Sequence, residues 1–162
     1  MLKELGITNF AIIDRIVLAF HDGLNVISGE TGAGKSILIG AIGLLLGDRA
    51  STDLIRSEED AAVVEAVFDI GAGKVLRERL QEMGFHPGRE IVVKRVVSRS
   101  GKNRVYIDGN LATVAMLGEI SETLVNVCSQ HEHQVLLDPE RHIDILDEFG
   151  NLGAPLGRYA AL

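Results

Sequence analysis

Hydrophobic and polar residues alternate over several stretches of the chain, and this two-residue period predicts β-strands. The first two stretches cover residues 2–9 and 13–20, with a short bend between them. A third covers residues 61–70, and residues 90–109 have the pattern of a β-hairpin with its turn at residues 99–103. An antiparallel pair at the start of the chain is unlike a purely parallel doubly wound fold. The pattern therefore predicts an α/β protein with a mixed sheet.

Apolar residues spaced three and four apart predict helices between and after these strands. They cover residues 37–46, 74–83, 112–123 and 139–149. Gly47 is placed to end the first helix, and the Asp138-Pro139 pair is placed to begin the last. Residues 151–162 carry apolar side chains at the spacing of one more helix.

Two short apolar runs, residues 24–28 and 124–128, predict buried strands, and a polar loop follows each of them. The first loop is Gly29-Glu30-Thr31-Gly32-Ala33-Gly34-Lys35-Ser36, which fits the pattern G-x-x-x-x-G-K-[ST]. The long helix begins directly after it. Strand, glycine-rich loop and helix are the context in which this pattern binds the phosphates of a nucleotide.

The residue types of the loop explain this chemistry. Its glycines adopt backbone conformations closed to other residues, so successive N–H groups converge on phosphate oxygens. The N-terminus of the following helix adds free N–H donors and partial positive charge. Lys35 is expected to reach the β- and γ-phosphates, and the Ser36 hydroxyl to bind Mg²⁺. The nucleotide-binding residues predicted from the loop are Gly29, Glu30, Thr31, Gly32, Ala33, Gly34, Lys35, Ser36 and Ile37.

The net charge of −7 argues against a surface coated in basic groups, although it allows a local basic patch. Basic residues do gather around the 99–103 turn, and acids stand only at the far ends of the hairpin. The cluster consists of Lys94, Arg95, Arg99, Lys102 and Arg104. Two interpretations stay open from the residues alone: a contact with a polyanion such as DNA, or a solvated tip that prevents aggregation through the sheet edge.

The cysteine content and the hydropathy of the chain indicate the cellular compartment in which the protein is expected. The 162 residues contain one cysteine, Cys128, so no disulfide forms within the chain, and a reducing cytosol is expected. No apolar run approaches the ~20 residues of a membrane span. The first residues lack the pattern of a signal peptide. We therefore expect a cytoplasmic protein with no membrane partner.

Three other features invite a chemical interpretation. His131 and His133 flank a glutamate, but no partner lies at a familiar zinc spacing, so metal binding by them is disfavoured. Residues 143–148 superficially resemble the strand that carries a catalytic carboxylate, but the cap before them places them on a helix. Arg49 lies one helix length from the phosphates. Spacing alone makes it a solvated loop arginine.

Taken together, several segments resemble the N-terminal part of the RecN family, bacterial double-strand-break repair ATPases of the SMC-like group. The resemblance extends from the first residues to about Gly150. The segments that carry it are residues 7–14, the phosphate loop Gly29–Ser36, residues 46–50, residues 98–104 and Gln130-His131-Glu132-His133-Gln134. The last block is the most specific. Ser129 stands where the family pattern has glycine.

The resemblance implies roles for individual residues. Gln130 would be the glutamine that contacts Mg²⁺ and the attacking water, and with Lys35 it would form the catalytic set. Ser36 and Gln130 would be the Mg²⁺ contacts. Arg49 would lie near nucleotide and DNA. The basic hairpin would face DNA, and the nucleotide would be ATP.

The resemblance also implies the architecture: an ABC/SMC-type P-loop ATPase head, represented here by its N-terminal lobe with an antiparallel β-subdomain and helices. Residues 1–150 would form this lobe, and residues 151–162 the start of a coiled-coil helix or a truncated tail. The signature motif and the carboxylate-bearing strand are missing from the sequence. We therefore expect an ATPase as the full protein and an inactive half-site in this chain alone.

The partners implied are DNA, the C-terminal half of the same head and a second head engaged through ATP, in the bacterial cytoplasm at the nucleoid. The alternatives are a nucleotide-binding subunit of an ABC transporter, a small-molecule kinase, and a non-catalytic nucleotide-binding lobe. A transporter subunit would lack the basic hairpin, and a kinase would carry an arginine-rich lid. Measuring turnover separates the non-catalytic lobe from the ATPase.

Overall fold

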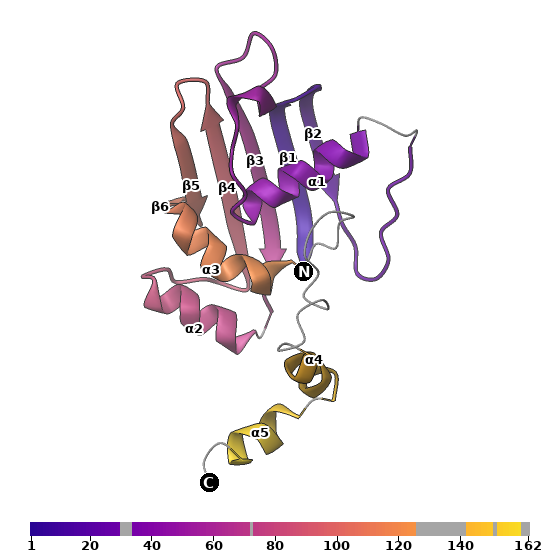
Figure 1. Ribbon diagram of the computed structural model, residues 1–162, viewed down its shortest axis with the longest axis vertical. Coiled ribbons are helices and arrows are strands. Elements are labelled where there is room, and N and C mark those ends of the chain that lie inside the picture. The colour runs from indigo at the N-terminus through magenta and orange to yellow at the C-terminus, as the bar shows by residue number, and fades with distance from the viewer. Residues whose placement is uncertain (30–33, 72, 126–141, 151, 160–162) are drawn as a thin grey trace. The chain divides into compact units, whose positions relative to one another are not determined.

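The computed structural model describes residues 1–29, 34–71, 73–125, 142–150 and 152–159 (Figure 1). The chain forms two compact units, residues 1–126 and 127–162. The phosphate loop and the basic hairpin both belong to the first unit. The sequence-based boundary at residue 150 stays a prediction.

A six-stranded antiparallel sheet forms the first unit, in the order β2-β1-β3-β4-β5-β6 (Figure 1). Each predicted alternating stretch forms a strand because its apolar residues can all face one side of the sheet. The strands are β1 (Leu2–Phe10), β2 (Ile13–Ala19), β3 (Ala61–Asp69), β4 (Glu90–Ser98), β5 (Asn103–Ile107) and β6 (Asn110–Ala112). The predicted opening antiparallel pair and the hairpin around residues 99–103 are confirmed.

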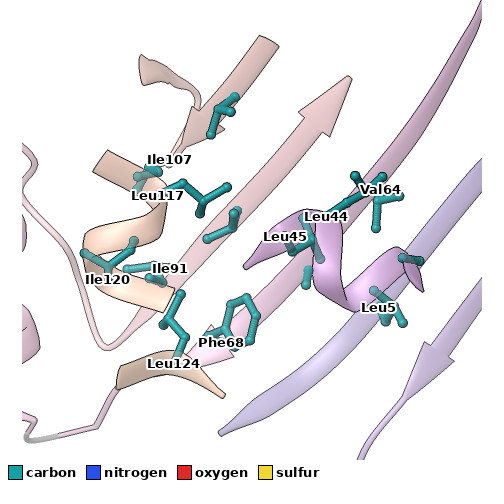
Figure 2. Close-up of a cluster of buried hydrophobic side chains, with 14 of the residues drawn as sticks. Leu5, Leu44, Leu45, Val64, Phe68, Ile91, Ile107, Leu117, Ile120 and Leu124 are labelled. Carbon is teal, nitrogen blue, oxygen red and sulfur yellow. The ribbon is translucent and has the colours of Figure 1, made fainter. Parts of the chain in front are cut away.

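The helices of this unit are α1 (Gly34–Leu45), the short 3₁₀ helix η1 (Thr52–Leu54), α2 (Lys74–Glu82) and α3 (Val114–Leu124). Helices α1 and α3 lie over one face of the sheet, and α2 packs against α3 (Figure 1). Figure 2 shows side chains of α1 and α3 turned toward the strands. From the helices come Leu44, Leu45, Leu117, Ile120 and Leu124, and from the strands Leu5, Val64, Phe68, Ile91 and Ile107. The predicted helices of this unit are therefore confirmed, with boundaries shifted by a few residues.

Helix α1 ends as its glycine predicts. The backbone N–H of Asp48 donates to the Gly43 carbonyl at 3.0 Å, and that of Gly47 to the Leu44 carbonyl at 3.3 Å. This pair of bonds is the Schellman arrangement, which needs a left-handed residue after the helix. Gly47 supplies it with φ +108°. The loop that carries Arg49 therefore leaves α1 in a fixed direction.

The predicted strand at residues 24–28 is not formed. These residues have no regular structure, and Leu24 and Val26 are 91% and 77% exposed. A strand needs a neighbour for its backbone donors and acceptors. Among the described residues, no strand pairs with this segment, and every pairing of the sheet is antiparallel. Residues 24–28 are therefore mostly apolar in sequence, but no described strand buries them.

The second unit contains two described helices, α4 (His142–Phe149) and α5 (Gly153–Tyr159). Helix α4 spans residues 143–148, so the rejection of a carboxylate-bearing strand there is confirmed. Helix α5 forms where the sequence predicts a further helix. The predicted strand 124–128 lies outside the described residues from residue 126 onward. No helix in the described part is long and apolar enough to cross a membrane.

We expect the core under α3 to dominate the stability of the first unit. Replacing Phe68, which is 1% exposed, with Ala removes a ring from the buried cluster, and the free energy of unfolding should fall by about 3–5 kcal/mol. Phe149→Ala is the matched control, because that ring is 88% exposed, and its effect should stay within about 0.5 kcal/mol. Urea denaturation followed by circular dichroism measures both. Equal effects would contradict the assigned core.

Candidate functional site

The phosphate loop leads into the N-terminus of α1, which begins at Gly34. The Lys35 ammonium bends back and donates to the Gly29 carbonyl, so the two ends of the loop are held together. The Ser36 residue is exposed on the first turn, and that turn contains no acidic residue. The positive end of α1 is therefore not neutralised by a carboxylate within its own first turn, which favours an anion there.

Four predicted phosphate-loop residues, Glu30, Thr31, Gly32 and Ala33, lie outside the described residues. Gln130, His131 and His133 lie outside them as well, so their predicted roles stay predictions. Within the described residues, no group of three or more His, Cys, Asp or Glu side chains gathers as a metal site would require.

An apolar surface cavity lies beside the described part of the loop. Its walls come from β2 through Ile13 and Ile16, from the unpaired segment through Ile27, and from α1 through Leu38. Gly29, Gly34 and Lys35 line it on the loop side. Within the described residues no strand pairs with the segment that contains Ile27, and Ile27 is 48% exposed, so this wall of the cavity is available for apolar contact.

The basic hairpin is less uniform than its sequence suggests. Lys102 and Arg104 are exposed, and within the described residues neither forms an ion pair with an acid. Lys94 pairs with Glu65 on the neighbouring strand at 3.2 Å. The first two side chains are therefore the best placed of the cluster for a polyanion.

Arg99 serves the structure of the loop beside the hairpin. Its Nε donates to the Glu59 carbonyl at 2.8 Å, and its Nη2 to the Arg56 carbonyl at 3.0 Å. Its backbone N–H donates to the Asp60 carbonyl at 2.8 Å. The acidic stretch 58–60 thus lies against the turn of the hairpin, and it weakens the positive field there.

Arg95 does not lie on the surface, and its predicted contact with a polyanion is wrong for this arrangement. The residue is 2% exposed, and its Nη1 donates to the carbonyls of Leu44 and Asp48 at 2.7 Å each. The alternation of β4 places Arg95 on the same buried face as Val93 and Val97. The sequence already shows that Arg95 alternates in step with Val93 and Val97, and this spacing distinguishes it from the exposed cations.

Arg49 follows the end of α1 and is exposed. The peptide that joins it to Asp48 carries the carbonyl held by Arg95. Arg49, a predicted ligand contact, therefore lies on a loop that is held in place by the buried Arg95.

Comparison with known proteins identifies relatives over nearly the whole chain. "DNA repair protein RecN" of Halalkalibacterium halodurans is 43% identical over 96% of this chain and 27% of its own length. "DNA repair protein RecN" of Bacillus subtilis is 43% identical over 92% of this chain and 26% of its own length. This chain therefore spans about a quarter of the length of these curated relatives.

Solved structures of SMC proteins share the fold. One, from work on ATP-driven dimerization and DNA-stimulated activation of SMC ATPases, has a TM-score of 0.64 at 21% identity and covers 91% of this chain and 98% of that chain. The SMC head domain from Thermotoga maritima has a TM-score of 0.56 at 26% identity and covers 78% of this chain and 43% of that chain. The predicted head-lobe fold is confirmed.

A family model described as the RecF/RecN/SMC N terminal domain matches residues 1–128. That match covers the sheet, α1 with the described part of the phosphate loop, and the basic hairpin. The chain belongs to the RecF/RecN/SMC N-terminal domain family.

Proposed function

We propose that this chain is the ATP-binding lobe of an SMC-like ATPase head that acts in the repair of DNA double-strand breaks. The observation that carries the proposal is the phosphate-loop sequence at the N-terminus of α1, a helix that packs against an antiparallel sheet of the SMC-head type. The repair assignment follows from relatives that are named DNA repair proteins. These relatives disfavour the transporter alternative.

The residues at the start of α1 fit Mg-ATP. Backbone N–H groups at the helix N-terminus suit phosphate oxygens, and the half-buried Lys35 supplies a cation at the same place. The exposed Ser36 hydroxyl suits a hard cation that prefers oxygen ligands. We assign Gln130 to Mg²⁺ and to orienting the attacking water. Mg²⁺ would supply charge neutralisation for phosphoryl transfer, and the protein residues would supply position.

Hydrolysis needs more than this lobe. Catalysis of phosphoryl transfer depends on positioning and on groups that stabilise charge, and the sequence contains neither a signature motif nor an acceptable carboxylate-bearing strand. The exposed apolar segment 24–28 suits the C-terminal half of the head, whose strand would bury it. A second head engaged through ATP would complete the site. The lobe alone is then a nucleotide-binding half-site with negligible turnover.

DNA is the proposed macromolecular partner, at the exposed tip of the hairpin. Lys102 and Arg104 supply cations there, and Lys94 lies on the preceding strand, partly offset by Glu65. Phosphate contacts of this kind give affinity without reading the sequence. The proposed DNA contact is therefore sequence-independent.

Lys35→Ala should weaken Mg-ATP binding by about tenfold or more, because the variant cannot make a charged hydrogen bond to phosphate. The fold should persist, since Lys35 is only partly buried. Isothermal titration calorimetry measures binding, and a thermal melt checks folding. Lys74→Ala is the control, because it removes the same charge from the first residue of α2. Binding of Mg-ATP by Lys35→Ala at the parent affinity would refute the assignment of the phosphate loop.

Changing Lys102 and Arg104 together to Ala should flatten the salt dependence of binding to duplex DNA. The slope of log affinity against log salt falls by roughly 0.9 for each DNA phosphate that the protein no longer neutralises. Fluorescence anisotropy across a salt series measures it. The control changes Lys74 and Arg89 to Ala, which alters the net charge equally but removes cations that already pair with acids. The hairpin has no part in DNA binding if both double variants share one slope.

A further inference from the structure

Arg95 is a buried cation in the middle of β4, and the nucleotide and DNA contacts proposed above leave it without a role. The other buried residues of that strand face, among them Val93 and Val97, are apolar. A hydrophobic side chain at such a position is often as stabilising as a buried ion, or more so. The Nε of Arg95 also has no partner in the described part of the chain. Core stability alone is therefore a weak reason for an arginine here.

The guanidinium lies at the C-terminal end of α1, the helix that begins at the phosphate loop. Helix α1 has no basic residue in its own last turn, so Arg95 brings a cation to its negative end from another element. One nitrogen, Nη1, donates to two acceptors at 2.7 Å each: the Leu44 carbonyl in the last turn and the Asp48 carbonyl beyond the helix. Arg95 thus ties the helix end to the loop that follows.

Asp48 completes this arrangement. Burial lowers the pKa of the Arg95 guanidinium, and the negative charge of Asp48 opposes that shift. The Asp48 carboxylate also lies against Gly43 of α1, where a side chain on residue 43 would overlap it. The backbone around Asp48 is therefore held by Arg95 on its carbonyl and by Gly43, whose carbonyl accepts from its N–H at 3.0 Å.

We propose that Arg95 is a positioning residue that fixes the Asp48–Arg49 peptide, so that Arg49 meets a phosphate oxyanion of the bound ligand. The hydrogen bond to the Asp48 carbonyl immediately precedes Arg49, and Arg49 itself is exposed. Arg95 acts through Arg49 and touches no ligand. The inference rests on the proposed function, which supplies two sources of phosphate, the nucleotide and the DNA backbone.

A double-mutant cycle on the 162-residue chain tests the inference, with Arg49→Ala, Arg95→Met and the double variant. Met keeps an unbranched side chain of similar length without the donors. Affinities for Mg-ATP and for duplex DNA are measured separately, which identifies the source of the phosphate. For one of these ligands, each single change should weaken binding by about tenfold. The double variant should bind that ligand no more weakly than Arg49→Ala.

Val93→Ala is the matched control, because it damages the same buried face of the same strand without touching the loop. It should lower the melting temperature and leave both affinities unchanged. Arg95→Lys keeps a cation without the planar fork, and its loss of affinity should be smaller than that of Arg95→Met. If Arg95→Met does not fold, Arg95→Lys replaces it in the cycle, and parent-like binding by this variant would overturn the inference.

Three other results would overturn it: parent-like binding of both ligands by Arg95→Met, losses that add fully in the double variant, or an equal loss of affinity in Val93→Ala. Failure of the proposed function is a separate result. In that case the parent chain itself binds neither Mg-ATP nor DNA, before any variant is compared.

Discussion

The packing of α1 against the antiparallel sheet is the interaction on which the rest of this lobe depends. Ala41, Leu44 and Leu45 are the buried residues of α1, and burying each leucine contributes about 2 kcal/mol. This contact fixes the axis of α1, and the phosphate loop sits at its free N-terminus. Backbone donors bind phosphate well only when they are held in place before the ligand arrives. The antiparallel sheet is thus the rigid base that holds the N-terminus of α1 in place.

The distribution of charge follows from the same base. In a chain of net charge −7, the basic residues near the hairpin have different tasks. Arg95 holds the end of α1, and Arg99 holds the loop that contains the acidic stretch 58–60. Lys102 and Arg104 at the tip are exposed, and neither pairs with an acid within the described residues. In the proposed function, contact between DNA and so small a cluster on an acidic protein would be weak and sensitive to salt.

Much of this lobe could be predicted from the sequence, because its strands bury one face and its glycines end its helices. The alternation of residues 61–70 fits a strand with one buried face, and the glycine at position 47 fits a helix end that needs a positive φ. The absence of a strand at residues 24–28 could not be predicted, because an apolar run shows that burial is favourable and not whether a neighbouring strand is present. Arg95 was wrongly predicted to be on the surface because the prediction used its charge and not its position in the alternation of β4, which places it on the buried face. The partners of Arg99 lie about forty residues away in sequence, so no local pattern indicates them.

The central claim is that α1 is already formed in this lobe alone, and that the exposed apolar segment 24–28 becomes buried only when the C-terminal half of the head binds. Hydrogen exchange followed by mass spectrometry tests it most directly, on the chain alone and with the C-terminal half of an SMC-like head. Alone, residues 41–45 of α1 should be protected, while residues 24–28 should exchange nearly as fast as an unstructured peptide. Adding the C-terminal half should slow exchange in residues 24–28. Protection of that segment in the chain alone, or no change on adding the partner, would contradict the account.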